Sequence, residues 1–177
     1  MTGYSLQRAW VDGTVLDDVL VEVEGERFTR VEVGGGGLAV TRLPGLTLPG
    51  LANAHSHAFH RALRGHVQRD RGTFWTWREQ MYAVAGRLTP ELYRALATAA
   101  FREMAAAGYT SVGEFHYLHH QPDGTPHEEP NAMRDALRDA AETAGIRLVL
   151  LDTAYLSSGF GAPPEGAQVR YSDGSGA

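Results

Sequence analysis

The sequence predicts an α/β protein, in which a small N-terminal β-layer precedes a parallel sheet with helices between its strands. Short alternating apolar runs fill residues 4–33, and apolar residues spaced three and four apart follow residue 73. Residues 146–151 form a nearly continuous apolar run, which is typical of a parallel strand covered on both faces. From residue 48 the predicted order is β-α-α-β-α-β, so we divide the chain into domains at residues 1–47 and 48–177.

The first domain is predicted to consist of short antiparallel strands. Two turn sequences, Asp12-Gly13 and Gly25-Glu26, separate its runs of alternating apolar residues. The four glycines at 34–37 are predicted to form a flexible connector. A β-layer of about 45 residues is too thin to be stable alone, so we expect it to need a partner.

The second domain is predicted to contain strands at residues 48–57, 110–117 and 146–151. Helices are expected over residues 74–88, from Thr89-Pro90 to about residue 107, and over residues 131–144. From residue 157 the chain is rich in Gly, Pro and Ser, and we expect loop to the last residue. The apolar faces expected to be buried are Phe74, Trp77, Met81, Val84 and Leu88 in the first helix, Leu92, Leu96, Ala99, Ala100 and Met104 in the second, and Met133, Leu137, Ala140 and Ala141 in the third.

The length of the second domain limits what it can form. A closed eight-stranded α/β barrel takes roughly 200–250 residues. About 130 residues follow residue 47, and they contain three predicted strands. If this is such a barrel, we expect the chain to cover less than half of it.

Composition excludes several classes of function. The net charge of −5 and the pI near 5.9 argue against nucleic-acid and anionic-membrane partners. All 16 basic residues are Arg, which excludes lysine Schiff-base chemistry, and the absence of Cys excludes thiolate metal sites and disulfides. No stretch approaches the ~18 apolar residues of a membrane span and no targeting signal begins the chain, so we expect a cytoplasmic protein.

His55-Ser56-His57 is the candidate metal site. Residues two apart on a strand point the same way, so both imidazoles would project from one face at the end of the 48–57 strand. Two imidazoles on one face can bind a single zinc ion at roughly 2.0–2.1 Å each. The alternative is a chance pairing, because the chain contains eight histidines.

Polar side chains also follow the other two strands of the second domain. In an α/β barrel the active site lies at the carboxyl ends of the strands, so this clustering predicts a site there. The alternative is that strands simply turn polar where they leave the core. The residues concerned are Glu114, His116 and Tyr117 after the second strand, and Asp152 and Tyr155 after the third.

The sequence gives weaker evidence for a functional role of Arg78 and of three histidines. Arg78 borders the apolar face of the first predicted helix, where a guanidinium could capture a carboxylate. Spacing alone favours an exposed arginine beside Glu79. His119, His120 and His127 lie in a turn-rich loop and are expected to be exposed to solvent.

Three sequence blocks resemble a known family. The segment 48–62, Leu-Pro-Gly-Leu-Ala-Asn-Ala-His-Ser-His-Ala-Phe-His-Arg-Ala, resembles the first barrel strand of the amidohydrolase superfamily. The segments 74–82, Phe-Trp-Thr-Trp-Arg-Glu-Gln-Met-Tyr, and 113–120, Gly-Glu-Phe-His-Tyr-Leu-His-His, narrow the resemblance to the formimidoylglutamate deiminases of histidine degradation. The resemblance covers essentially the whole chain. It implies a metal-dependent (β/α)8 barrel joined to a small β-sandwich.

The resemblance also implies residue roles and a reaction. His55 and His57 match first-strand zinc ligands, and Arg78 and Tyr117 match positions that bind the substrate's carboxylates. His60 falls where some relatives have a substrate-facing Gln. The implied reaction is zinc-dependent hydrolysis of N-formimidoyl-L-glutamate to N-formyl-L-glutamate and ammonia. A homodimer is expected from the family.

The resemblance places further functional groups later in the chain. The remaining metal ligands, on the fifth and eighth barrel strands, and the acid/base His and Glu are expected beyond residue 177. We therefore expect a truncated barrel that is inactive alone, because a catalytic zinc site needs at least three protein ligands. The alternatives are a deaminase of the aminopurine or pyrimidine type and a non-catalytic remnant. Iron, nickel and manganese also remain open as the metal, because His and carboxylate ligands suit them too.

Overall fold

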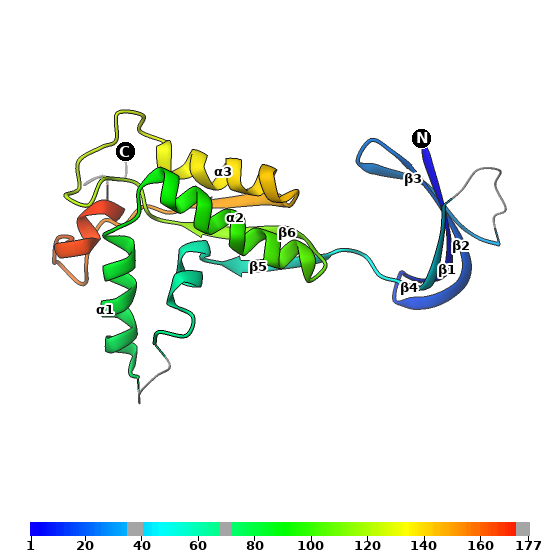
Figure 1. Ribbon diagram of the computed structural model, residues 1–177, viewed down its shortest axis with the longest axis horizontal. Coiled ribbons are helices and arrows are strands. Elements are labelled where there is room, and N and C mark those ends of the chain that lie inside the picture. The colour runs from blue at the N-terminus through cyan, green and yellow to red at the C-terminus, as the bar shows by residue number, and fades with distance from the viewer. Residues whose placement is uncertain (35–40, 68–71, 173–177) are drawn as a thin grey trace. The chain divides into compact units, whose positions relative to one another are not determined.

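The computed structural model describes residues 1–34, 41–67 and 72–172 as two compact units, Met1–Pro49 and Gly50–Ala177 (Figure 1). The division lies two residues after the boundary that the sequence suggested. Most of the predicted glycine connector, residues 35–37, lies outside the described residues. None of the described helices is long and apolar enough to cross a membrane.

The first unit is a four-stranded sheet with the order β3-β2-β1-β4. Strands β1 (Thr2–Val11), β2 (Thr14–Glu24) and β3 (Arg27–Val33) are antiparallel neighbours, whereas β4 (Thr41–Thr47) pairs parallel to β1. Asp12 and Gly13 both have positive φ, as a tight two-residue hairpin requires. Buried Leu6, Ala9, Val19 and Val21 form a small core, while 76% of Phe28 is exposed. The antiparallel strands were predicted, and β4 was not.

The second unit is built on three parallel strands in the order β5-β6-β7. These are β5 (Leu51–Ser56), β6 (Tyr109–His116) and β7 (Arg147–Asp152). Between β5 and β6 lie the short 3-10 helix η1 (Ala58–Leu63), α1 (Phe74–Ala85) and α2 (Pro90–Ala106), and α3 (Ala132–Ala144) connects β6 to β7. Helices α2 and α3 pack side by side along the sheet (Figure 1). The predicted order β-α-α-β-α-β is therefore observed.

The helix ends follow local sequence signals. The Thr89 side chain accepts a hydrogen bond from Leu92 N at 3.3 Å, and Pro90 takes the first helical position of α2. Gly145 ends α3 with φ +71°, a left-handed conformation that costs glycine little. Both ends were predicted.

Two predicted helix faces were partly wrong. In α2 the buried residues are Tyr93, Ala97, Ala100 and Phe101, whereas 54% of Leu92 is exposed. Large aromatic side chains bury more apolar surface than leucine, so Tyr93 and Phe101 turn the helix toward the sheet. In α1 Met81 is buried, but 62% of Phe74 is exposed in the first turn. The predicted face of α3 is buried in full.

Two other predictions were wrong for structural reasons. Strand β7 is not covered on both faces, because 59% of Val149 and 44% of Leu151 are exposed.

The tail is not loop throughout, because a 3-10 helix η2 (Gly166–Tyr171) buries its last two residues. Arg170 is fully buried, and its guanidinium donates to the backbone carbonyls of Ala85, Leu88 and His120. The tail is thus anchored at the C-terminal end of α1 by polar contacts, which apolar periodicity does not reveal.

Candidate active site at the carboxyl ends of the parallel strands

His55 and His57 converge at the end of β5. Their Nε2 atoms lie 3.0 Å apart, and Ser56 between them is buried on the other side of the strand. Bonds of about 2.0–2.1 Å to one tetrahedral zinc ion would separate the two nitrogens by roughly 3.3 Å. The pair therefore fits a shared cation with little movement. It also fits an N–H···N hydrogen bond between the two rings.

Glu114 on β6 fixes the backbone that carries this pair. Its carboxylate accepts a hydrogen bond from Ala58 N at 2.6 Å, and the Ser56 hydroxyl also stabilises its charged form. Glu114 is fully buried, and this burial raises its pKa to about 7 despite the two donors. The carboxylate thus holds the residues on both sides of His57 in place.

His60 stands directly beside the histidine pair because of the helix that follows. Residues three apart eclipse in a 3-10 helix, so the rings of His57, which caps η1, and His60 stack with centroids 4.6 Å apart. Burial, followed by the nearby His57 and His55, lowers the pKa of His60 to about 4. Its ring is neutral near pH 7, and Nε2 lies 3.0 Å from the Tyr117 hydroxyl.

Tyr117 follows β6 and lines the site from the carboxyl end of this neighbouring strand. It is 5% exposed and packs edge-on against the rings of His57, Tyr155 and Tyr171. Burial raises the pKa of its phenol well above the ordinary value, so the hydroxyl keeps its proton and can donate it in a hydrogen bond.

Arg78 lies on the inward-facing part of α1. Its Nε donates to the Tyr82 hydroxyl at 2.9 Å, and its guanidinium carbon lies 5.0 Å from the centre of the Tyr82 ring. Tyr82 in turn neighbours Tyr171, which contacts Tyr117.

The structure therefore brings His55, His57, His60 and Tyr117 into one chain of contacts, and it connects Arg78 to them through tyrosines. No ion pair of Arg78 with a carboxylate is found among the described residues.

Comparison with known proteins gives the family of the chain. A model described as the amidohydrolase family matches residues 46–171. This chain belongs to the amidohydrolase family. The predicted α/β fold, with part of an amidohydrolase barrel and additional strands, is confirmed.

Three relatives define how far the similarity extends. Formimidoylglutamate deiminase from Pseudomonas aeruginosa is 44% identical over 138 residues, which are 76% of this amidohydrolase chain and 30% of that protein. 8-Oxoguanine deaminase from the same bacterium is 32% identical over 73 residues, 41% of this chain and 16% of that protein. The crystal structure of an amidohydrolase from Brucella melitensis superimposes with a TM-score of 0.91 at 36% identity, over 98% of this chain and 40% of that chain. The chain spans less than half the length of each relative, and the predicted resemblance to formimidoylglutamate deiminases is confirmed.

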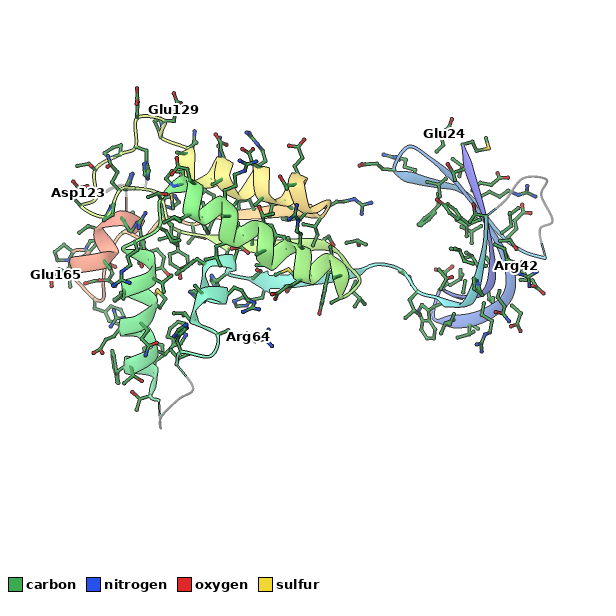
Figure 2. The ribbon with its side chains drawn as sticks, in the orientation of Figure 1. Glu24, Arg42, Arg64, Asp123, Glu129 and Glu165 are labelled. Atoms are coloured by element: carbon green, nitrogen blue, oxygen red, sulfur yellow. The ribbon has the colours of Figure 1, made fainter. Side chains whose placement is uncertain are left out.

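The loop histidines of this amidohydrolase were wrongly predicted to be exposed. His120 is 9% exposed, and His119 and His127 are partly buried. The cause is η2, because the carbonyl of Arg170 accepts hydrogen bonds from the backbone N–H groups of His119 and His120 at 3.0 Å each. The loop from β6 to α3, where Asp123 and Glu129 are labelled in Figure 2, is therefore anchored at its start.

Sequence reasoning missed two features of the site region. Arg170 gave no signal, because nothing local distinguishes a buried arginine from an exposed one. The grouping of His116, His119 and Asp152 was also missed, although His116 and Asp152 were both recognised as strand-end residues. The register of β6 against β7, which pairs these two residues, would have brought them together.

Proposed function

We propose that this chain supplies part of the active site of a zinc-dependent hydrolase that converts N-formimidoyl-L-glutamate to N-formyl-L-glutamate and ammonia. The observation that carries the proposal is the 44% identity with formimidoylglutamate deiminase over 138 residues. The proposed metal ligands in this chain are His55 and His57, and the proposed substrate-binding residues are His60, Arg78 and Tyr117.

The donor set near His55 supports zinc. Both imidazoles offer Nε2 at a separation that suits a tetrahedral ion, and zinc accepts neutral imidazole readily. Bound zinc would supply Lewis-acid activation of water. Glu114 keeps the pair in position through Ala58, so the imidazoles need little reorganisation to take up the ion. A catalytic zinc site needs at least three protein ligands, so we expect this chain to be inactive by itself.

The substrate would be recognised by its two carboxylates. The guanidinium of Arg78 can bind one carboxylate through two parallel hydrogen bonds. The protonated hydroxyl of Tyr117 can donate to the other carboxylate. His60 is neutral, so it can donate one hydrogen bond and accept another, and Tyr117 already lies within reach of its Nε2. In the reaction, water replaces the terminal imino nitrogen of the formimidoyl carbon, and that nitrogen leaves as ammonia.

The test is ammonia release by the complete gene product from N-formimidoyl-L-glutamate, with 8-oxoguanine and cytosine as competitors. We expect formimidoylglutamate to be preferred. Arg78→Gln should raise KM at least tenfold with a smaller change in kcat, because the guanidinium binds a part of the substrate that does not react. Arg87→Gln, an exposed arginine near the end of α1, is the matched control and should behave like the parent protein.

A purine deaminase is the second candidate, and the 32% identity with 8-oxoguanine deaminase favours it. A neutral base offers Arg78 no carboxylate, so turnover of 8-oxoguanine with an unchanged KM in Arg78→Gln would replace the first proposal. If neither substrate releases ammonia, both proposed activities are refuted and the alternative of a non-catalytic remnant gains support.

A further inference from the structure

We propose that His116, His119 and Asp152 form a second divalent-metal site of the zinc class, separate from the His55/His57 pair. Each of the three side chains offers one ligand atom, and these atoms lie within 4.8 Å of one another. This inference is independent of the proposed deiminase activity, because it rests on three residues that have no part in that proposal.

The sheet register explains why these residues meet. His116 and Asp152 are paired in the parallel register of β6 and β7, so their side chains leave the sheet on the same face. Phe115, one residue earlier, points to the opposite face and contacts His57, with ring centroids 5.2 Å apart. The proposed site and the His55/His57 pair therefore lie on opposite faces of the sheet.

His116 is a buried imidazole whose polar edge is not satisfied. It is 1% exposed and lies against Tyr93 of α2, with ring centroids 6.2 Å apart. Its Nδ1 is buried and has no hydrogen-bond partner in the described part of the chain. Leaving a buried polar atom unpaired is unfavourable, and a metal–nitrogen bond is one way to satisfy such an imidazole.

His119 has the surroundings of a metal ligand. Its Nε2 lies 2.8 Å from the carbonyl oxygen of Thr153 and donates a proton to it, which leaves the lone pair on Nδ1. Nδ1 lies 3.7 Å from Oδ1 of Asp152. Histidine ligands generally donate their second ring N–H to a carbonyl or carboxylate, which fixes the tautomer and the ring orientation.

The geometry and the charges suit zinc. Ligand atoms around tetrahedral zinc lie roughly 3.3 Å apart, so the widest separation in the group has to shrink by up to about 1.5 Å, and the exposed carboxylate of Asp152 is free to move. Three protein ligands and one water would complete the coordination. The positive charge of Arg134 acts on His116 and disfavours a bound cation. The Asp135 carboxylate lies 3.2 Å from the Arg134 guanidinium and offsets this charge.

Metal at this site would tie the two strand ends together. His116 ends β6, Asp152 ends β7, and His119 belongs to the loop that follows β6. Tyr117 lies between two of the ligands in sequence, so occupancy would fix the backbone that presents its hydroxyl to His60. We therefore expect a structural role, with Tyr117 held in place as a consequence.

The experiment is a Co²⁺ titration of the metal-free chain, followed by visible absorption and checked by Zn²⁺ competition. The His55→Gln/His57→Gln double variant serves as the background, because it removes the other candidate ligands. We expect one equivalent of Co²⁺ to bind with the absorption of a tetrahedral complex. Asp152→Asn and His119→Gln, each added to this background, should weaken binding at least about tenfold.

The controls keep the result interpretable. His66→Gln removes an exposed histidine outside the group and should leave the affinity unchanged. The Asp152 side chain is 56% exposed, so Asp152→Asn should fold normally, which circular dichroism verifies. The proposal is overturned if the double variant binds no Co²⁺, or if neither Asp152→Asn nor His119→Gln weakens the binding.

Discussion

Replacing Glu114 by Gln should make the folded chain more stable at alkaline pH and nearly unchanged at acid pH. Burial raises the pKa of Glu114 to about 7 from the ordinary value of 4.5. Because the folded state holds the proton more tightly than the unfolded state, this group's contribution to stability is fully present below pH 4.5. It is lost as the pH rises through about 7. The difference between these two pKa values corresponds to about 3 kcal/mol in the free energy of unfolding. The amide that Glu114→Gln introduces carries no charge at any pH, and its oxygen can still accept the hydrogen bond from Ala58 N.

The assay is urea unfolding between pH 4.5 and pH 8.5, in EDTA so that no cation binds nearby. Trp10 lies in the first unit and the other two tryptophans lie in α1, so a Trp10→Phe background makes fluorescence report on the second unit. We expect the stability difference between Glu114→Gln and its parent to grow by about 3 kcal/mol across this range. Glu103→Gln is the control, because Arg61 lowers the pKa of this exposed carboxylate and no gain with pH should follow. A pH-independent difference for Glu114→Gln would show that the carboxylate is not penalised by burial.

Two further predictions concern stability. Arg170→Met keeps the aliphatic volume but removes the donors to three backbone carbonyls, so the free energy of unfolding should fall by about 3–5 kcal/mol. Urea unfolding measures this loss, and a loss no larger than that of the half-exposed Arg134→Met would contradict it. Gly145→Ala places a side chain at φ +71° and should cost about 1 kcal/mol, of which Gly145→Asn should recover part. Equal stabilities of these two Gly145 variants would argue against a conformational origin.

Local sequence signals predicted most of the fold and the first part of the site. Strand and helix order depend on periodicity and on caps such as Thr89 and Gly145, which act within a few residues. His55 and His57 were placed on one face by strand alternation alone, and their rings do converge. Arg78 shows the limit of this reasoning, because its spacing favoured an exposed side chain. Its contact with Tyr82 is local to the helix, but Tyr82 neighbours Tyr171 of η2, and this long-range contact depends on how α1 packs.

Contacts between distant segments account for the errors. The loop histidines were predicted to be exposed because nothing near them in sequence is apolar, yet η2 returns some fifty residues later and covers them. The same return buries Arg170, whose partners lie in α1 and in the turn after it. Polar long-range contacts of this kind have no periodic signature, so a single sequence does not disclose them.

The error over β7 has a different origin and bears on the site. Leu148 and Leu150 pack against the helices, while Val149 and Leu151 point to the other face and stay exposed. Leu151 pairs with Phe115, and Phe115 contacts His57, so the exposed apolar face of the sheet is the one that carries the proposed metal pair. In an α/β barrel that face is the interior, filled by side chains from all the strands, and its carboxyl end is the active site. The apolar run in β7 therefore predicted a covering on this face that the described residues do not supply. Any layer that buried Val149 and Leu151 would therefore lie on the same face of the sheet as His57.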